Sequence, residues 1–482
     1  MRCFCEKFFL CFTVIPLCLG ITLGLIVEES HAQTSEMKSG FAQVLIDAEV
    51  DLEAFSSLRS GSTTLTTSQR ENLDQILYWM DRFDKKERNK YLIPARELAG
   101  RNSADVVGEL VSLRGTARSF EKSSGEGSEG SLYSIQLEPE GVQEKVTILT
   151  RQVPRYWIEG PLSETVSCEG VVLTIPSDGS STGHIVLAER IAWHPEKDVP
   201  AGWIELARLG YDVALLDEVR HGQPFVDERV SQEATAFREI IKAVSDANPS
   251  LILKSASREV TARRATWSEE SNRLDAEWKQ ASSQNRSDAK TLKRKRDIAL
   301  AAIDRAEKGF SSVAPLFLQP EKETGRLVLL EGTARRAVRV ANEENPSVGD
   351  YFELEFFPTD SQNLPIVCCV PKLPSGFPTG DRIREPIRVG GFFFKKWRYQ
   401  SRKLGSEPNQ AGSQQKAAFA PLVIAPTVIW IQEPTVAGSS DFGFTAGMVG
   451  LIVIIALGIL IVRAMKHDRI ARRRPSRYDE GS

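Results

Sequence analysis

Alternating apolar and polar residues predict a run of β-strands in the first half of the chain. Five runs rich in Val, Ile, Leu and Thr are separated by clusters of Gly, Pro, Ser and Asp. In the first run the alternation is typical of a strand with one solvent-facing side. Gly115 lies in its middle, where glycine allows the sharp bend that a small barrel needs. The predicted strands are 110–120, 132–137, 146–153, 165–175 and 184–193.

The strand pattern occurs twice. Residues 108–118 (GELVSLRGTAR) and 325–335 (GRLVLLEGTAR) are identical at 8 of 11 positions, and Gly115 corresponds to Gly332. The order of the similar segments that follow is also kept. The pairs are 133–137 with 351–355, 166–173 with 387–394, and 185–193 with 422–430. Chance does not explain this agreement, and the sequence therefore predicts an internal duplication.

Each copy is preceded by a short helical pattern with apolar residues at i, i+3, i+4 and i+7, which places them on one helix face. These residues are Leu73, Ile76, Leu77 and Met80 in the first copy, and Phe237, Ile240, Ile241 and Val244 in the second. Residues 51–61 and 212–222 also correspond. We therefore expect two helix-plus-barrel units in tandem.

Five strands of this length, with a wide gap between the third and fourth, resemble the OB-fold, a five-stranded Greek-key barrel. The opening Leu-Val-x-Leu-x-Gly-Thr-Ala-Arg and the closing Ile-Val-Leu-Ala-Glu-Arg-Ile carry this resemblance. An SH3-like barrel or a small sandwich is the alternative. The expected class is α+β, with two OB-like units, one helical insertion and one transmembrane helix.

The insertion lies between the helical segment and the barrel of the second copy. Its two apolar stripes are separated by the polar residues 282–287, which favours an antiparallel helical hairpin. One long helix in an intermolecular coiled coil is the alternative. Candidate partner-helix residues are Trp267, Leu274 and Trp278. The basic cluster Lys290, Lys293, Arg294, Lys295 and Arg296 is either a solvated helix face or a contact for an anionic surface.

The two ends of the chain predict a membrane topology. Residues 1–32 have a basic start, an apolar run and a Ser-His-Ala site, which indicates a signal peptide cleaved after Ala32, with an uncleaved anchor as the alternative. The stretch 442–462 carries no charged residue, and its length matches a bilayer span of about 30 Å. The basic residues that follow predict a cytoplasmic C-terminus. We expect a single-pass protein of the cytoplasmic (inner) membrane with its bulk outside the cytoplasm.

These patterns divide the chain into eight segments. They are a signal peptide at 1–32, a helical segment at 33–107, a first barrel at 108–195, a second helical segment at 200–254, the hairpin or coiled coil at 255–310, a second barrel at 325–432, the transmembrane helix at 442–462 and a basic tail at 463–482.

Composition narrows the possible functions. The net charge of −3 gives no global attraction to nucleic acid, and we expect no nucleic-acid partner. Only Cys168, Cys368 and Cys369 lie outside the predicted signal, which is not a disulfide framework. No histidine has metal-ligand spacing, and no nucleophile elbow, phosphate loop or dinucleotide fingerprint occurs. The sequence predicts no metal, no cofactor and no enzymatic activity.

One stretch has the composition of a binding site. It combines the aromatic rings that stack on sugars or bases with the cations that bind phosphates. Its alternation allows one face to fill the barrel and the other to be exposed, and a purely structural strand is the alternative. The candidate binding residues are Phe392, Phe394, Lys395, Lys396, Trp397, Arg398 and Tyr399.

The layout resembles that of uncharacterised membrane-anchored envelope proteins of planctomycete-type bacteria, through residues 209–217, 391–399 and 420–425. The resemblance implies an envelope location and no activity. The predicted function is a non-enzymatic envelope protein that binds or scaffolds another envelope protein. The alternative is a glycan- or anionic-lipid-binding protein that uses the aromatic and basic strand.

Overall fold

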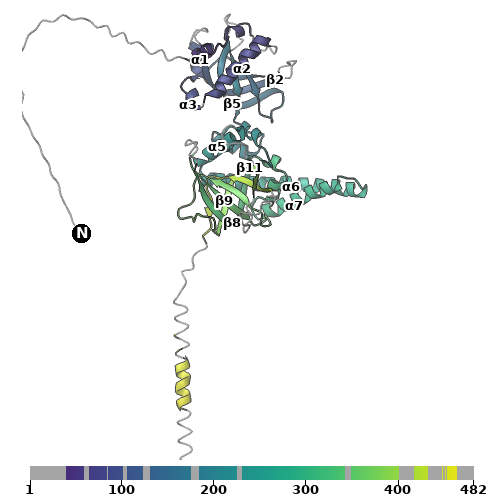
Figure 1. Cartoon of the computed structure of the whole chain (residues 1–482). Coiled ribbons are helices and arrows are strands. Elements are labelled where there is room, and N and C mark those ends of the chain that lie inside the picture. The colour runs from purple at the N-terminus through teal and green to yellow at the C-terminus, as the bar shows by residue number, and fades with distance from the viewer. Residues whose placement is uncertain are drawn as a thin grey trace, which may run out of the picture.

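The structure is a computed structural model of the chain. It is an α+β protein with two mixed β-sheets, of seven and six strands (Figure 1). The structure describes residues 40–58, 65–83, 85–100, 106–122, 131–174, 184–224, 231–341, 349–400, 417–432, 448, 451 and 453–463.

The first unit has helices at its N-terminal side and a barrel after them. The longest helix, α2, begins with a capping box in which Thr66 and Gln69 each accept a hydrogen bond from the backbone N–H of the other. The helical elements are α1 (Phe41–Asp47), η1 (Glu53–Phe55), α2 (Thr67–Arg82), α3 (Lys85–Arg88) and η2 (Ala95–Gly100). The strands are β1 (Ile93–Pro94), β2 (Leu110–Lys122), β3 (Tyr133–Pro139), β4 (Val146–Gln152), β5 (Gly160–Thr174), β6 (Ile185–Arg190) and β7 (Ala192–Trp193).

The second unit repeats this order and adds a long hairpin. Its helical elements are α4 (Ala201–Arg208), η4 (Val213–Glu218), α5 (Gln232–Ser245), α6 (Pro249–Ser283), α7 (Ala289–Glu307), α8 (Ala314–Leu318) and α9 (Pro320–Glu323). Its strands are β8 (Leu327–Val340), β9 (Tyr351–Pro358), β10 (Ile366–Val370), β11 (Glu385–Gln400), β12 (Ala417–Ile424) and β13 (Ile429–Trp430).

Both sheets close into rings with the same connectivity. In the first, β2 pairs with β5 as well as β3, which closes the ring β2-β3-β4-β6-β5. In the second, the pairing of β11 with β12 closes the ring β8-β9-β10-β12-β11. In the first ring β4 and β6 run parallel, and in the second β10 and β12 do. All other ring pairs are antiparallel. The duplication seen in the sequence is therefore a duplication of strand order.

Two glycines show how closely the barrels agree. A Cβ atom added at Gly115 would lie 2.1 Å from the Glu138 carbonyl oxygen, and one added at Gly332 would lie 2.1 Å from the Phe357 carbonyl oxygen. No side chain fits at either position, because both contacts are with the backbone of the next strand. Both glycines thus permit the close approach that the tight ring requires.

The outer face of each barrel is covered by its own helical segment. In the first unit Leu110 and Leu187 pack with Phe41 of α1 and Ile76 of α2. Leu110 has no solvent exposure. The strand face that the alternation predicts to be solvent-exposed is therefore buried at this end of β2. In the second unit the corresponding Leu327 and Ile424, with Phe392 and Phe394, pack in the same core as α5 and α6.

The two units share one hydrophobic core. The interior of the first barrel, the segment from α4 to α6 and the outer face of the second barrel belong to a single cluster of buried residues. Trp193 at the end of the first barrel packs edge-on against Trp203 of α4, with ring centroids 5.8 Å apart. The Trp203 indole N–H donates to the Thr324 carbonyl at 2.8 Å, which ties α4 to the start of the second barrel. The units are therefore packed together rather than separately tethered (Figure 1).

The prediction of a transmembrane helix at 442–462 is wrong. Among the helices that the structure describes, none is long and apolar enough to cross a membrane. The predicted signal peptide lies outside the described residues, as does the predicted tail apart from Arg463.

Candidate functional site

The predicted binding strand is β11, and the structure buries half of it. Phe392, Phe394 and Lys395 have no solvent exposure. Lys396 and Trp397 are half-buried, and Arg398 is exposed. The backbone of Tyr399 pairs with Ala418 of β12, while its side chain lies outside the described part of the chain. The structure therefore brings only part of the predicted set to the surface.

A β-bulge explains this placement. The register between β11 and β12 shifts between Phe393 and Lys395. A bulge breaks the strict alternation of faces, so the residues beyond it point elsewhere than their spacing predicts. Phe393 joins the core of the second barrel, and Phe392 and Phe394 join the core shared with α5 and α6.

Lys395 is turned inward to a carboxylate on α5. Its ammonium nitrogen lies 2.7 Å from Glu233 Oε1, and the two side chains are 0% and 4% exposed. Glu233 also accepts a hydrogen bond from the backbone N–H of Arg220 at 2.8 Å. Burial lowers the pKa of Lys395, and the hydrogen bond and charge of Glu233 oppose that shift. Such a pair requires its full set of partners, since a buried charge that loses its counterion is strongly destabilising.

His221 joins three segments beside this ion pair. Its Nδ1 accepts from the backbone N–H of Lys396 at 3.2 Å, and its Nε2 lies 3.0 Å from Thr324 Oγ1. The Thr324 hydroxyl donates to the Pro320 carbonyl, so His221 Nε2 carries the proton and donates to Thr324. Burial, helped by the charges of Lys395 and Lys396, lowers the pKa of His221 to about 4, with Glu321 opposing the shift. A neutral imidazole fits both hydrogen bonds.

A small surface patch remains at the end of β11. The ammonium of Lys396 lies 5.2 Å from the ring centroid of Phe419, and Phe419 is 41% exposed. Arg398 is exposed nearby on the same strand. The turn at 221–223 holds the backbone of this patch, because the Gly222 N–H donates to the Lys396 carbonyl at 2.8 Å and the Arg398 N–H donates to the Gln223 carbonyl at 3.4 Å. The patch can offer two cations and one ring to a ligand.

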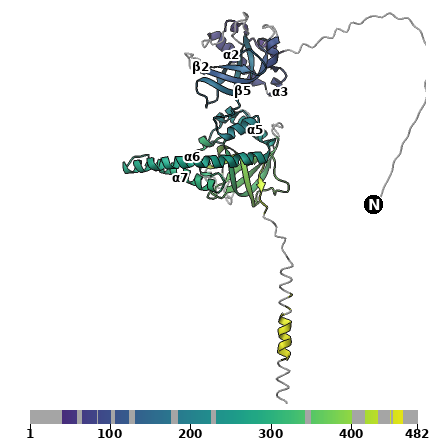
Figure 2. The same ribbon diagram turned by 180° about the vertical axis from the view of Figure 1, so that it is seen from behind.

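The helical insertion is a hairpin. Helices α6 and α7 run antiparallel, as the ion pairs Arg264–Glu307 near the base and Asp275–Arg296 further out show. The pair extends away from the second barrel in both views of the molecule (Figures 1 and 2). The structure therefore has the hairpin rather than one unbroken helix over this region.

The predicted partner-helix residues contribute to the hairpin itself. Trp267 is 8% exposed and packs against Ala299 and Ala302 of α7. Leu274 is 4% exposed. Trp278 is half-buried, with the Arg296 guanidinium 4.3 Å from its ring centroid. Their role in binding a partner stays a prediction, because within the described chain these side chains hold α6 against α7.

Ion pairs fix the base of the hairpin to the second barrel. Arg263 of α6 makes two hydrogen bonds of 2.7 Å to Glu323, whose side chain is 2% exposed. Glu259, one turn earlier, lies 3.2 Å from Arg326. A bidentate arginine–carboxylate pair is directional as well as strong, so it sets the angle at which the hairpin leaves the barrel.

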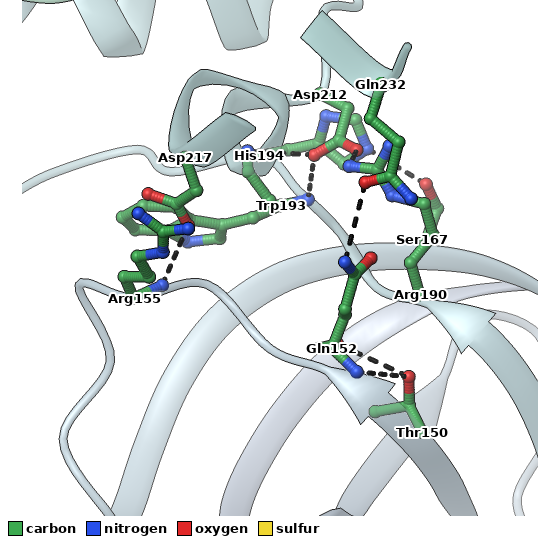
Figure 3. Close-up of polar contacts among 11 residues, drawn as sticks. Thr150, Gln152, Arg155, Ser167, Arg190, Trp193, His194, Asp212, Asp217 and Gln232 are labelled. Carbon is green, nitrogen blue, oxygen red and sulfur yellow. Dashed lines mark hydrogen bonds and ion pairs between the residues drawn. The ribbon is translucent and has the colours of Figure 1, made fainter. Parts of the chain in front are cut away.

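A second polar cluster lies where the first barrel meets the second unit (Figure 3). Asp212 caps η4 by accepting from the Ala214 N–H, and it also accepts from the Trp193 N–H at 2.8 Å. Its other oxygen binds Arg190 of β6. Burial raises the pKa of Asp212, while Arg190 and the two backbone donors oppose that shift. The carboxylate thus joins the end of one unit to the start of the next.

Ser167 and His194 in this cluster resemble part of a nucleophilic site. Ser167 Oγ lies 2.9 Å from His194 Nε2 (Figure 3). Burial lowers the pKa of His194, and the charge of Asp212 opposes the shift. However, Ser167 sits inside β5, between Arg114 of β2 and Ala192 of β7. Its neighbouring N–H groups belong to strand ladders and are not directed at an oxyanion position. The contact is best understood as a lock between β5 and the segment after β7.

The remaining candidate chemistry is structural. The thiols of Cys168, Cys368 and Cys369 are buried, and burial raises the pKa of Cys168 and of Cys368 to about 12, which makes them poor nucleophiles. Among the residues that the structure describes, no three His, Cys, Asp or Glu side chains are placed to hold a metal ion.

Sequence reasoning missed the partners of β11. Glu233 is 162 positions away from Lys395, and Thr324 is 103 positions away from His221. The one available signal was an acidic residue in the first turn of α5, on a helix that the duplication had already located. Comparison with protein-family models and with curated proteins finds no match for this chain.

Proposed function

We propose that this protein is a non-enzymatic scaffold of the cell envelope, and that the α6–α7 hairpin is the surface that binds another envelope protein. The observation that carries the proposal is the projection of the hairpin from the two packed barrels (Figures 1 and 2). The duplication supports it as well, because the hairpin is the element that the second unit has in addition to the shared helix-plus-barrel plan.

The construction of the hairpin suits a protein contact. Trp267 and Leu274 are buried inside it, so its two helices are held together without a partner. Its base is fixed by the Arg263–Glu323 pair. A rigid helical surface on a fixed base presents a partner with a preorganised face, which reduces the entropy lost on binding.

The experiment is site-specific crosslinking in intact cells. A photoactivatable residue replaces Ser283 at the turn of the hairpin, and in a matched control it replaces Glu121, which is exposed on the first barrel. The full-length protein is purified and its crosslinked products are identified by mass spectrometry. We expect a stoichiometric protein partner from position 283 and none from position 121. Only self-crosslinks, or a partner captured from position 121 alone, would contradict the hairpin assignment.

A second candidate function is binding of a glycan or an anionic lipid headgroup at the end of β11. The observation in its favour is the patch formed by Lys396, Arg398 and the exposed ring of Phe419. Reversing both charges, with Lys396→Glu and Arg398→Glu, should abolish binding to phosphatidylglycerol vesicles or to an acidic glycan and leave the hairpin crosslink unchanged. Loss of the crosslink with ligand binding intact would assign the protein contact to β11 instead.

A further inference from the structure

The start of α7 carries a group of cations without ion-pair partners in the described part of the chain. Lys290, Lys293, Arg294 and Lys295 are all exposed, and none forms an ion pair with a described residue. We call these four residues the basic tip. Neighbouring cations of the hairpin are paired: Arg286 with Asp288, Lys279 with Asp275, and Arg296 with both Asp275 and Asp297.

The basic tip is placed where positive charge is unfavourable. It occupies the first two turns of α7, the positive end of the helix macrodipole, and the first turn contains no acidic residue. Lys290 is followed by Lys293 and Arg294 at i+3 and i+4, where like charges repel each other. The Asp288 side chain makes no capping hydrogen bond to the helix. The isolated hairpin would therefore be more stable with acidic residues here.

An arrangement that weakens the free helix is explained if a partner supplies the missing negative charge. A protein is favoured over a membrane surface by the chemistry of the turn. Ser282, Ser283, Gln284 and Asn285 are polar and exposed, so the turn has no apolar side chain to insert among lipids. Trp278, the nearest large ring, is half-buried beneath Arg296 and Lys293.

We infer that the basic tip binds an acidic segment of a protein partner. The inference rests on the proposed function of the hairpin and names the chemistry of its partner. Four exposed cations within two turns of α7, without ion-pair partners in the described chain, would attract an acidic segment over a Debye length. This attraction accelerates encounter and makes the contact sensitive to salt. Neutralising the cations would also remove the repulsion within α7.

The test uses the full chain and a fluorescent poly-glutamate peptide as probe. The variant Lys290→Glu/Arg294→Glu reverses two charges of the basic tip, and Arg273→Glu/Lys254→Glu reverses two cations elsewhere on α6 as a control. We expect the tip variant to weaken peptide binding at least about tenfold. The control variant should bind as the parent does, and added salt should weaken the parent's binding.

A stability measurement separates lost binding from lost structure. The tip variant places acidic residues at the helix N-terminus, so its helix content and melting temperature should equal or exceed those of the parent. Weaker peptide binding together with a lower melting temperature would overturn the inference, as would unchanged binding. Binding of phosphatidylglycerol vesicles without binding of the peptide would overturn it in favour of a membrane contact.

The crosslink at position 283 distinguishes this failure from failure of the proposed function. If the tip variant keeps that crosslink to a protein partner, the hairpin still binds protein and only the acidic chemistry is wrong. If the parent itself gives no partner from position 283, the proposed function fails, whatever the peptide binds.

Discussion

The two units use one plan with different polar residues at its centre. Thr174 in β5 and Lys395 in β11 each follow a register shift against the last strand of their ring. Gln69 lies in the first turns of α2 as Glu233 does in α5, and both are 4% exposed. The first unit thus has neutral residues where the second has a buried ion pair. The two copies therefore share the same fold but differ in the polar residues buried at these positions.

This difference shows what a shared backbone does and does not determine. Both units have a closed ring of strands, a glycine that lies against the backbone of the next strand, and a barrel face covered by helices. These features recur because they follow from strand geometry and apolar packing. The ion pair does not recur, because it needs two matched charges at positions that packing alone leaves open. At this pair of positions, stability depends on charge in the second unit and not in the first.

The largest effect should come from breaking the ion pair. Glu233→Gln keeps an oxygen for the Arg220 N–H but leaves the buried Lys395 ammonium without this carboxylate. We expect a loss of about 3–5 kcal/mol in the free energy of unfolding. The matched Gln69→Ala variant in the first unit should lose only about 1 kcal/mol. Urea unfolding followed by circular dichroism measures both.

The double variant Glu233→Gln/Lys395→Thr provides the control, since it gives the second unit the neutral residues of the first. It should recover much of the lost stability. If the double variant is as unstable as Glu233→Gln, the loss of unfolding free energy does not come from the unpaired charge of Lys395.

A smaller and equal effect is expected at the two glycines. Gly115→Ala and Gly332→Ala each place a Cβ about 2.1 Å from a backbone oxygen of the neighbouring strand. We expect each to lose about 1–3 kcal/mol of unfolding free energy through forced backbone shifts. Arg114→Ala, at an exposed position of β2, should change it by less than about 0.5 kcal/mol. Clearly unequal losses at the two glycines would mean that the barrels tolerate strain differently.

The hydrogen bond that ties α4 to the start of the second barrel should contribute less still. Trp203→Phe keeps an aromatic ring near Trp193 but removes the indole N–H that donates to the Thr324 carbonyl. We expect a loss of about 1 kcal/mol, measured by thermal unfolding. A loss well above that value would indicate that this bond also positions the ring of Trp203 against Trp193 of the first barrel.

The smallest effect at neutral pH concerns His221. Its pKa in the folded chain is lowered to about 4, below its ordinary value of 6.5. Between these values the unfolded chain binds the proton more readily, so the contribution of His221 is present above about pH 6.5 and is lost as the pH falls toward 4. His221→Asn retains an acceptor for the Lys396 N–H and should flatten this slope, as unfolding midpoints at pH 7 and 5 would reveal. An unchanged slope would place the pH dependence elsewhere.

Much of the fold could be predicted because it follows from local patterns. The five predicted strands of the first barrel occur within a few residues of β2 to β6 and β7, and the helical stripe ending at Met80 lies in α2. The spacing of apolar residues indicates which face of a strand or helix is buried, and each of these elements has one buried face. The prediction for Leu110 was less accurate, because the helices that dry its face come from residues far earlier in the chain.

The candidate site was less predictable, for reasons visible at Lys395. Side chains alternate strictly between the two faces only in a regular strand. The register shift between Phe393 and Lys395 interrupts this alternation, so the face of Lys395 could not be predicted from spacing. A basic residue next to three phenylalanines indicates a binding surface when its partner is unknown. Here the partner, Glu233, lies on another element and can be found only once the chain is folded.

Helix α6 also has a mechanical consequence. It is unbroken over 35 residues, about 52 Å. Ile252 and Ala256 at one end are embedded in the core shared by both barrels, and Ala281 is near the other end. Between these ends, the Arg263–Glu323 ion pair anchors α6 to the segment just before the second barrel. A pull on the far end would be delivered as torque to Leu253, which lies against Gly390 of β11. A force applied at the far end of α6 would thus reach the wall of the second barrel.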